Sequence, residues 1–310
     1  MVRKRPQSLS ENNKNYFVFL LLIISVLGVA WGSFTEVKAG ILYLSIFLTS
    51  TGVIVLAQFF VNENDKKTIK QFFKTPFSSS PLVSSAMWLF GFYTIIFINL
   101  IGSLFKQGFS TVEFFSPLYL SAGGLSSGIS QSFQAGVIEN SEFANWFYGV
   151  FVAGTIEEFT WAFALPLAFW IIGILIVQMF FNNKFPYFEN KTFYFWFSMI
   201  FSVLTFMQIH QLNGSYVGIM FLVAGIFRFI LNFAVYFIGF VISFNIGIHM
   251  SNNNFAWIMI NGLPKFIEIL FTNIYGLAIL FLFVGLNIYV LKNLNKIFSL
   301  VADEVRSFRR

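Results

Sequence analysis

Two adjacent carboxylates lie inside a long apolar stretch of the sequence. Glu157 and Glu158 fall within residues 143–181, FANWFYGVFVAGTIEEFTWAFALPLAFWIIGILIVQMFF, with no Lys or Arg among their near neighbours. A carboxylate inside a membrane span costs a few kcal/mol, and two adjacent carboxylates resist ionising together. A carboxylate held in this way can act as a general base on a water molecule, and the pair titrates as a unit. The stretch therefore predicts a functional site, and the rest of the chain must supply its partners.

The chain contains two histidines, and each has a candidate partner one helical turn away. His210 closes the apolar segment FMQIH, with Phe206 four residues before it. His249 begins the segment HMSNN, with Asn253 four residues after it. Residues four apart share a helix face, so each pair can point into one cavity. Both histidines follow apolar runs, which places them at the ends of predicted spans.

These motifs resemble, in type and order, those of the CAAX protease and bacteriocin-processing family, which includes the Ras-converting endopeptidase and the Abi proteins. The family motifs EExxxR, FxxxH and HxxxN lie on separate transmembrane helices in this order, and the similar region here covers residues 145–257. The matching residues are Glu157 with Glu158, Phe206 with His210, and His249 with Asn253. The resemblance implies an intramembrane endopeptidase whose catalytic base is a Glu of the pair. It also implies that His210 orients the water and that His249 and Asn253 stabilise the oxyanion.

One position departs from the family pattern. The Arg of EExxxR is replaced by Ala162, which follows Trp161. The glutamate pair is thus without its usual guanidinium partner, and this bears on activity more than on fold. Arg228 is the only Arg in a later apolar span and is a candidate substitute, although an Arg there more often snorkels or forms a structural ion pair.

The same residues are compatible with a metal site. One Glu with two His is a known zinc set with water in the open position, so Glu157, His210 and His249 are candidate ligands. A metal-free mechanism, in which a carboxylate deprotonates the water, fits these residues as well.

Three other interpretations remain open. The chain can be a catalytically impaired family member that serves as a binding or bacteriocin-immunity membrane protein. It can also be a proton-coupled transporter in which Glu and His side chains form a relay. In the structural alternative, the glutamate pair is a buried hydrogen-bonding anchor between helices.

The elements that must position these residues are membrane helices. The sequence is 57% hydrophobic and 10% charged, whereas a soluble domain is about 25% charged. Several apolar runs reach the roughly 20 residues that cross a bilayer as a helix. The sequence therefore predicts an all-α, polytopic transmembrane bundle of about eight spans, integral to the plasma membrane. The net charge of +6 is interpreted as a positive-inside bias and not as a nucleic-acid footprint.

The spans are assigned from the apolar runs. They cover residues 16–34, 40–61, 85–105, 145–181, 192–210, 216–232, 234–250 and 269–291. Pro166 is expected to kink the central stretch. A single transmembrane domain, 16–291, then lies between a basic cytoplasmic tail, 1–15, and an amphipathic basic tail, 292–310.

The loop charges set the orientation. Basic residues place the N-terminus and residues 62–84 inside, and acidic residues place the long connection 106–144 outside. Both histidines then lie at the outer ends of outgoing spans, at a depth similar to that of the glutamate pair. The expected substrate is a peptide or lipidated protein that enters from the bilayer.

Overall fold

The computed structural model describes residues 50, 52, 76–78, 80–108, 142–176, 191–212, 219–238 and 241–308. Within these ranges every regular element is a helix, which confirms the all-α prediction for this part of the chain. The tail 1–15 and the predicted spans 16–34 and 40–61 lie outside the described residues, apart from Ser50 and Gly52. Most of the connection 106–144 also lies outside them.

Three described helical stretches are long and apolar enough to cross a membrane: Pro81–Ile98, Glu142–Gly173 and Ile274–Lys292. Shorter apolar helical stretches cover Trp196–Gln208 and Gly225–Tyr236. By length and composition the described part of the chain therefore has the helices of a membrane protein.

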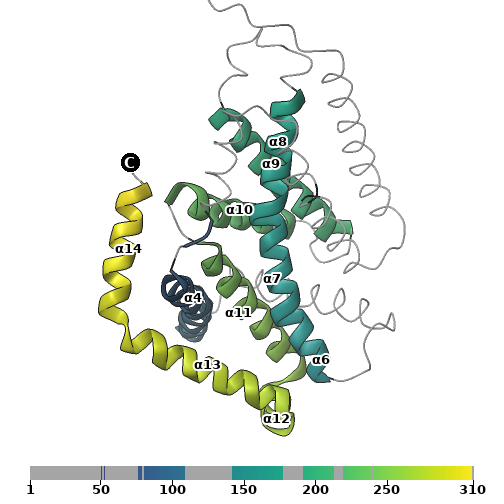
Figure 1. The fold of residues 1–310 in the computed structure, drawn as a ribbon. Coiled ribbons are helices and arrows are strands. Elements are labelled where there is room, and N and C mark those ends of the chain that lie inside the picture. Colours follow the sequence, from purple (N-terminus) through teal and green to yellow (C-terminus); the bar gives the residue numbers. More distant parts are fainter. Residues whose placement is uncertain are drawn as a thin grey trace, which may run out of the picture.

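A continuous helical rod runs through the middle of the molecule (Figure 1). Its consecutive segments are α6 (Glu142–Phe147), η1 (Tyr148–Val152), α7 (Ala153–Glu158), η2 (Phe159–Ala164) and α8 (Leu165–Ile176). The segments η1 and η2 are π-helical turns, in which the backbone hydrogen bond spans five residues instead of four. Pro166, which was expected to kink this stretch, stands at the second position of α8, directly after the wide turn η2.

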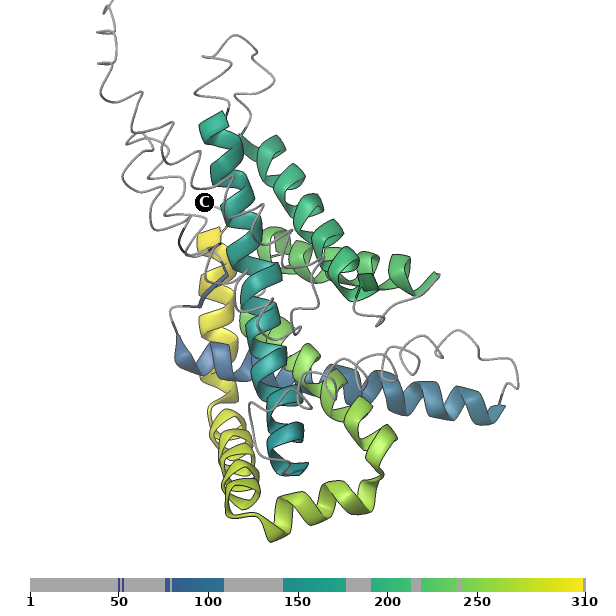
Figure 2. The same ribbon diagram turned by 90° about the vertical axis from the view of Figure 1, so that its right-hand side faces the viewer.

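Three further helices pack along the rod. The helix α9 (Lys191–Leu212) contacts α8 and η2, and α10 (Ile219–Phe233) packs on α9 and continues into the π-turn η5 (Ala234–Ile238). The helix α11 (Ile242–Asn261) contacts α7 and η1 on one side and α4 (Pro81–Gly108) on the other. Figure 2 shows α4 running crosswise to the rod.

The helices α4 and α11 cross at two glycines. A Cβ atom on Gly247 would lie 2.1 Å from the carbonyl oxygen of Trp88, and one on Gly91 would lie 2.1 Å from that of Phe244. Only residues without a Cβ allow the two backbones to come this close. The crossing therefore fixes the position of α11, the helix that carries His249.

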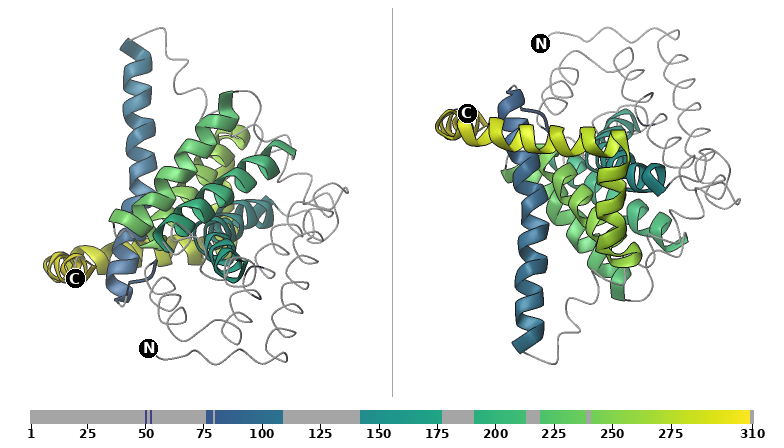
Figure 3. Two further views of the ribbon diagram at one scale, coloured as in Figure 1. Left: turned by 90° about the horizontal axis from the view of Figure 1, so that it is seen from above. Right: turned by 90° about the horizontal axis from the view of Figure 1, so that it is seen from below.

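The last three helices form the periphery. They are α12 (Leu263–Thr272), α13 (Ile274–Lys292) and α14 (Leu294–Phe308). Gly262, with φ of 89°, turns the chain from α11 into α12. In the view from below, α13 runs across α4 (Figure 3). The predicted tail 292–310 contains α14, whose Ile297 is buried against α4 while Phe298 on another face is exposed.

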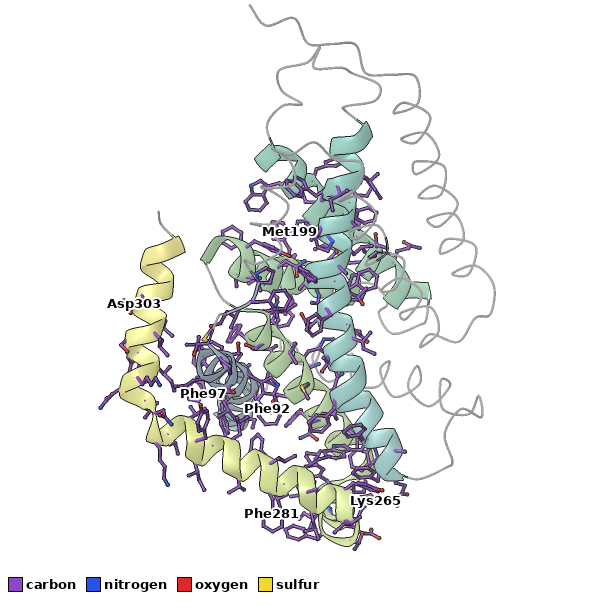
Figure 4. The ribbon with its side chains drawn as sticks, in the orientation of Figure 1. Phe92, Phe97, Met199, Lys265, Phe281 and Asp303 are labelled. Carbon is purple, nitrogen blue, oxygen red and sulfur yellow. The ribbon has the colours of Figure 1, made fainter. Side chains whose placement is uncertain are left out.

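A large part of the buried core lies where the rod meets α9 and α10. The largest fully buried side chains include Trp161, Trp170, Ile171, Met199, Val235 and the charged Glu158. Figure 4 shows Met199 on α9 close to the rod at this level. The glutamate pair therefore belongs to the protein interior.

The predicted span 234–250 is wrong at both ends. The helix α11 begins at Ile242 and continues to Asn261, so His249 and Asn253 lie within it and not at its outer end. The polar run after His249 suggested a helix exit, but Ser251 and Asn253 are 2% and 3% exposed. Their polar groups face other parts of the protein and not water, so the polar run does not mark the end of the helix.

Candidate active site

Glu158 is held between a guanidinium and an imidazole. Its side chain is fully buried, and its Oε2 atom accepts a hydrogen bond from Arg228 Nη1 at 2.7 Å. Its Oε1 atom lies 2.8 Å from His249 Nδ1. The rod supplies the carboxylate, α10 the guanidinium and α11 the imidazole. Both carboxylate oxygens of Glu158 are thus engaged, as a buried charge requires.

Glu157 faces the other side of the same imidazole. Its Oε2 atom lies 3.4 Å from His249 Nε2, and its side chain is 10% exposed whereas that of Glu158 is not exposed at all. The imidazole therefore bridges two carboxylates. Glu157 is therefore the more accessible of the two carboxylates.

The formal charges of these four side chains (Glu157, Glu158, Arg228 and His249) cancel in two protonation arrangements. With both carboxylates ionised and His249 protonated, two negative charges face two positive ones. With His249 neutral and Glu157 protonated, Glu158 alone balances Arg228. The two arrangements differ only in the position of one proton between Glu157 Oε2 and His249 Nε2. In the first arrangement Glu157 is an ionised base, which is the form that can accept a proton from water.

Arg228 reaches Glu158 from a different helix than the motif Arg would. The motif position, Ala162, is fully buried within η2. The Arg228 guanidinium lies over the Phe206 ring at 4.7 Å from its centroid, and Phe206 packs edge-on against Trp161 at 5.7 Å. Phe206 thus supports the arginine, a role that its place in the FxxxH pattern did not indicate.

Replacing Phe206 by Leu is expected to lower the free energy of unfolding by about 1 kcal/mol more than replacing Phe163 by Leu. Both rings are buried, at 5% and 8% exposure, but only Phe206 lies under a guanidinium, and a desolvated cation–π contact contributes about 1–2 kcal/mol. Unfolding of both variants in detergent micelles, followed by circular dichroism, measures the difference. Equal losses for the two variants would contradict a supporting contact with Arg228.

Asn253 is bound to the rod one turn after His249. Its Nδ2 atom donates to the carbonyl oxygen of Gly149 in η1 at 2.9 Å. A carbonyl can only accept, so this bond fixes which side of the amide faces η1. The Oδ1 atom is buried and has no hydrogen-bond partner among the described residues. The amide therefore holds α11 to the rod, in addition to any role that the resemblance implies.

The end of the rod at α6 is tied by two polar contacts. Trp146 Nε1 donates to Asn254 Oδ1 of α11 at 2.8 Å, and Lys265 of α12 forms an ion pair with Glu142. Figure 4 shows Lys265 at this end of the molecule. The hydrogen bond and the charge of Glu142 raise the pKa of the Lys265 ammonium above its usual value. These contacts keep α6 aligned with α11 outside the glutamate site.

His210 lies in the last turn of α9, one turn after Phe206. Its side chain lies outside the described residues, so its predicted role is untested. Among the described residues no group of three or more His, Cys, Asp and Glu side chains could hold a metal ion.

Two of the three proposed zinc ligands can be compared with zinc geometry. Tetrahedral zinc, with bonds of about 2.0–2.1 Å, holds neighbouring donor atoms about 3.4 Å apart. The 3.4 Å between Glu157 Oε2 and His249 Nε2 fits this spacing. The contact of His249 Nδ1 with Glu158 also fits the carboxylate–histidine arrangement of zinc sites. Zinc held there would supply hydroxide at neutral pH, and His210 would have to provide the third protein ligand.

Sequence reasoning missed three donors that bind the rod beside the glutamates. They are Ser202, Asn232 and Tyr236. The sequence contains a signal for Asn232 and Tyr236. Together with Arg228 they recur at intervals of four in an otherwise apolar segment. Such spacing places all three on one helix face.

Comparison with known proteins did not identify a relative of this chain. No family model, no curated protein and no solved structure matches the chain. The likeness to the CAAX-processing family therefore rests on the motif residues alone.

Proposed function

We propose that the chain is an intramembrane endopeptidase of the CAAX-processing type, in which Glu157 activates the attacking water. The observation that carries the proposal is the contact of one imidazole with both carboxylates of an intramembrane Glu pair, with Arg228 balancing the deeper one. A lone buried carboxylate would be costly, whereas the Glu157 carboxylate has an imidazole partner at 3.4 Å.

The proposed reaction assigns one role to each of these groups. Glu157 Oε2 takes a proton from water while the water oxygen attacks the peptide carbonyl carbon. The carbonyl oxygen becomes an oxyanion, and in this proposal it accepts a hydrogen bond from the N–H group of His249 on the Glu157 side. The C–N bond then breaks, and the leaving amine takes the proton from Glu157. Glu158 and Arg228 hold the imidazole in orientation throughout.

The setting proposed for this reaction is the plasma membrane. The chain would cross it about eight times, with the spans 16–34 and 40–61 included. Its substrate would be a membrane-associated peptide or lipidated protein that enters from the bilayer, and a prenylated C-terminal tail has the chemistry that the family resemblance implies. In this proposal His210 orients the water.

The test is to replace Glu157 by Gln and follow peptide cleavage. A Gln side chain keeps the shape but cannot accept the proton, and loss of general-base catalysis lowers the rate about 100-fold or more. The purified protein in proteoliposomes is assayed with a quenched, farnesylated CAAX reporter peptide. In parallel, mass spectrometry of peptide termini compares membranes that carry the wild type or the variant.

A matched control is Glu142→Gln, which removes an exposed carboxylate from the first turn of the same rod and should cleave at the wild-type rate. A chelator such as 1,10-phenanthroline separates the two mechanisms, because only a zinc-dependent reaction stops. If wild type and Glu157→Gln give the same termini and the same reporter signal, the peptidase assignment is wrong.

A second candidate function is proton transfer across the membrane. It is favoured by the imidazole, which joins Glu157 to Glu158 and so forms a carboxylate–imidazole–carboxylate chain. Vesicles loaded with a pH-sensitive dye distinguish the two functions. A proton pathway gives a pH change that Glu157→Gln abolishes, with no peptide cleavage in either protein.

A further inference from the structure

The six residues that carry the glutamate pair are flanked by π-turns on both sides. The segment α7 lies between η1 and η2, and in each turn a carbonyl oxygen accepts a hydrogen bond from a side chain of another helix. Wide turns of this kind are rare and frequently lie at functional sites. Side-chain bonds at both ends of α7 fix its rotation about the rod axis.

The carbonyl oxygen of Trp161 in η2 is available because of Pro166. In this turn the N–H of Leu165 donates to the oxygen of Thr160, five residues before it. The next bond in the series would join residue 166 to the oxygen of Trp161, but proline has no N–H. The Trp161 oxygen instead accepts from Ser202 Oγ at 2.9 Å and from Asn232 Nδ2 at 3.1 Å.

A third donor binds the next carbonyl. The hydroxyl of Tyr236 donates to the oxygen of Ala162 at 2.8 Å. Ser202 and Asn232 are not exposed at all, and Tyr236 is 6% exposed. All three bonds lie in the protein interior, where an unpaired carbonyl would be costly.

The helix faces that bind the η2 carbonyls also carry the residues that contact or support the partner of Glu158. On α10 and η5, Arg228, Asn232 and Tyr236 follow one another at intervals of four and so lie on one helix face. From this face Arg228 pairs with Glu158, while Asn232 and Tyr236 bind the two carbonyls. On α9, Ser202 binds the Trp161 oxygen, and Phe206 one turn later lies under the Arg228 guanidinium. A rotation of α9 or of α10 would therefore displace the bonds to the carbonyls together with the contacts around Arg228 and Glu158.

We propose that Ser202, Asn232 and Tyr236 are positioning residues of the Glu–His site. On an α-helix, adjacent side chains point about 100° apart, yet Glu157 and Glu158 both reach one imidazole. The rod must therefore hold one defined rotation, and these donors fix it at the end of α7 next to the glutamates. The expected loss of kcat rests on the proposed function, whereas the expected change in the contacts between His249 and the two glutamates does not.

The test uses small deletions that keep the packing. Ser202→Ala and Tyr236→Phe are made singly and together, because each removes only a hydroxyl. The matched controls remove hydroxyls elsewhere: Tyr93→Phe, since the Tyr93 hydroxyl bonds Asn287 at the surface, and Thr205→Val, since the Thr205 hydroxyl bonds its own helix and valine keeps the shape of the side chain. In the reporter assay the double variant should lose kcat about tenfold or more with KM unchanged, since small displacements of a catalytic group are costly. The controls should keep both constants.

A second readout does not require activity. The chain has two histidines, so ¹⁵N-histidine labelling gives two imidazoles, which a His210→Gln variant assigns. The ¹⁵N shifts of His249 should change in the double variant and not in the controls. If the wild type cleaves no peptide but these shifts change, the peptidase assignment fails and the positioning role stands. If the shifts and kcat of the double variant equal those of the wild type, the positioning role is wrong, even where thermal stability falls.

Discussion

Replacing Arg228 by Met is expected to lower the free energy of unfolding by about 3–5 kcal/mol and to stop peptide cleavage. The side chains of Arg228 and Glu158 are 4% and 0% exposed, and they are joined at 2.7 Å. Removing one partner of a buried ion pair leaves the other charge buried without compensation, which accounts for the size of the loss. Unfolding in mixed detergent micelles, followed by circular dichroism, gives the free energy, and the reporter peptide gives the activity.

Two further variants separate charge balance from catalysis. Adding Glu158→Gln to Arg228→Met removes both charges, so most of the stability should return while cleavage stays absent. Lys296→Met removes an exposed cation from α14 and should change stability by less than about 0.5 kcal/mol. If Arg228→Met is as stable as the wild type, the guanidinium does not compensate Glu158 in the membrane protein.

Replacing Gly247 by Ala is expected to lower the free energy of unfolding by about 3 kcal/mol. The new Cβ atom would lie 2.1 Å from the carbonyl oxygen of Trp88, and this backbone group cannot move without displacing α4. Overpacking of a well-packed contact costs about 1–3 kcal/mol, and a clash between backbones belongs at the upper end. Because α11 also carries His249, cleavage should fall with stability. The same unfolding and reporter assays measure both effects.

Gly285→Ala is the matched control for this helix crossing. It lies in α13 with no atom within 4 Å of its new Cβ atom, and Ala has a higher helix propensity than Gly by about 1 kcal/mol. This variant should be unchanged or slightly more stable. Equal stability of Gly247→Ala and the wild type would show that α4 and α11 are not in backbone contact.

The sequence predicted the centre of the site better than its surroundings. The Glu pair and His249 could be singled out from the sequence, because a polar or charged residue in an apolar run is costly and so indicates a specific role. The structure brings Glu157, Glu158, His249 and Arg228 together. Arg228 was a candidate partner of the glutamate pair, but the sequence could not show which carboxylate it meets, since 70 residues separate it from Glu158 and the packing of α10 on the rod joins them.

The errors have a common physical cause. Hydropathy treats a polar residue as a step toward water, so the Asn-rich run after His249 was assigned to a helix end. In the fold, Asn253 and Asn254 bind the rod and α6 instead. The same reasoning left Ser202 and Asn232 unremarked, because a single polar residue in an apolar helix does not show which carbonyl it will bind.

The cancelling charges of the Glu–His cluster have a consequence in an energised membrane. A transmembrane voltage acts on a net charge with about 2.3 kcal/mol per elementary charge for each 100 mV. Four side chains whose charges sum to zero have no such term, so a voltage acts on them less than on a single buried charge. Shifting one proton across the 3.4 Å between Glu157 and His249 crosses about a tenth of a 30 Å hydrocarbon layer. The field thus changes the balance of the two protonation arrangements by at most about 0.3 kcal/mol per 100 mV.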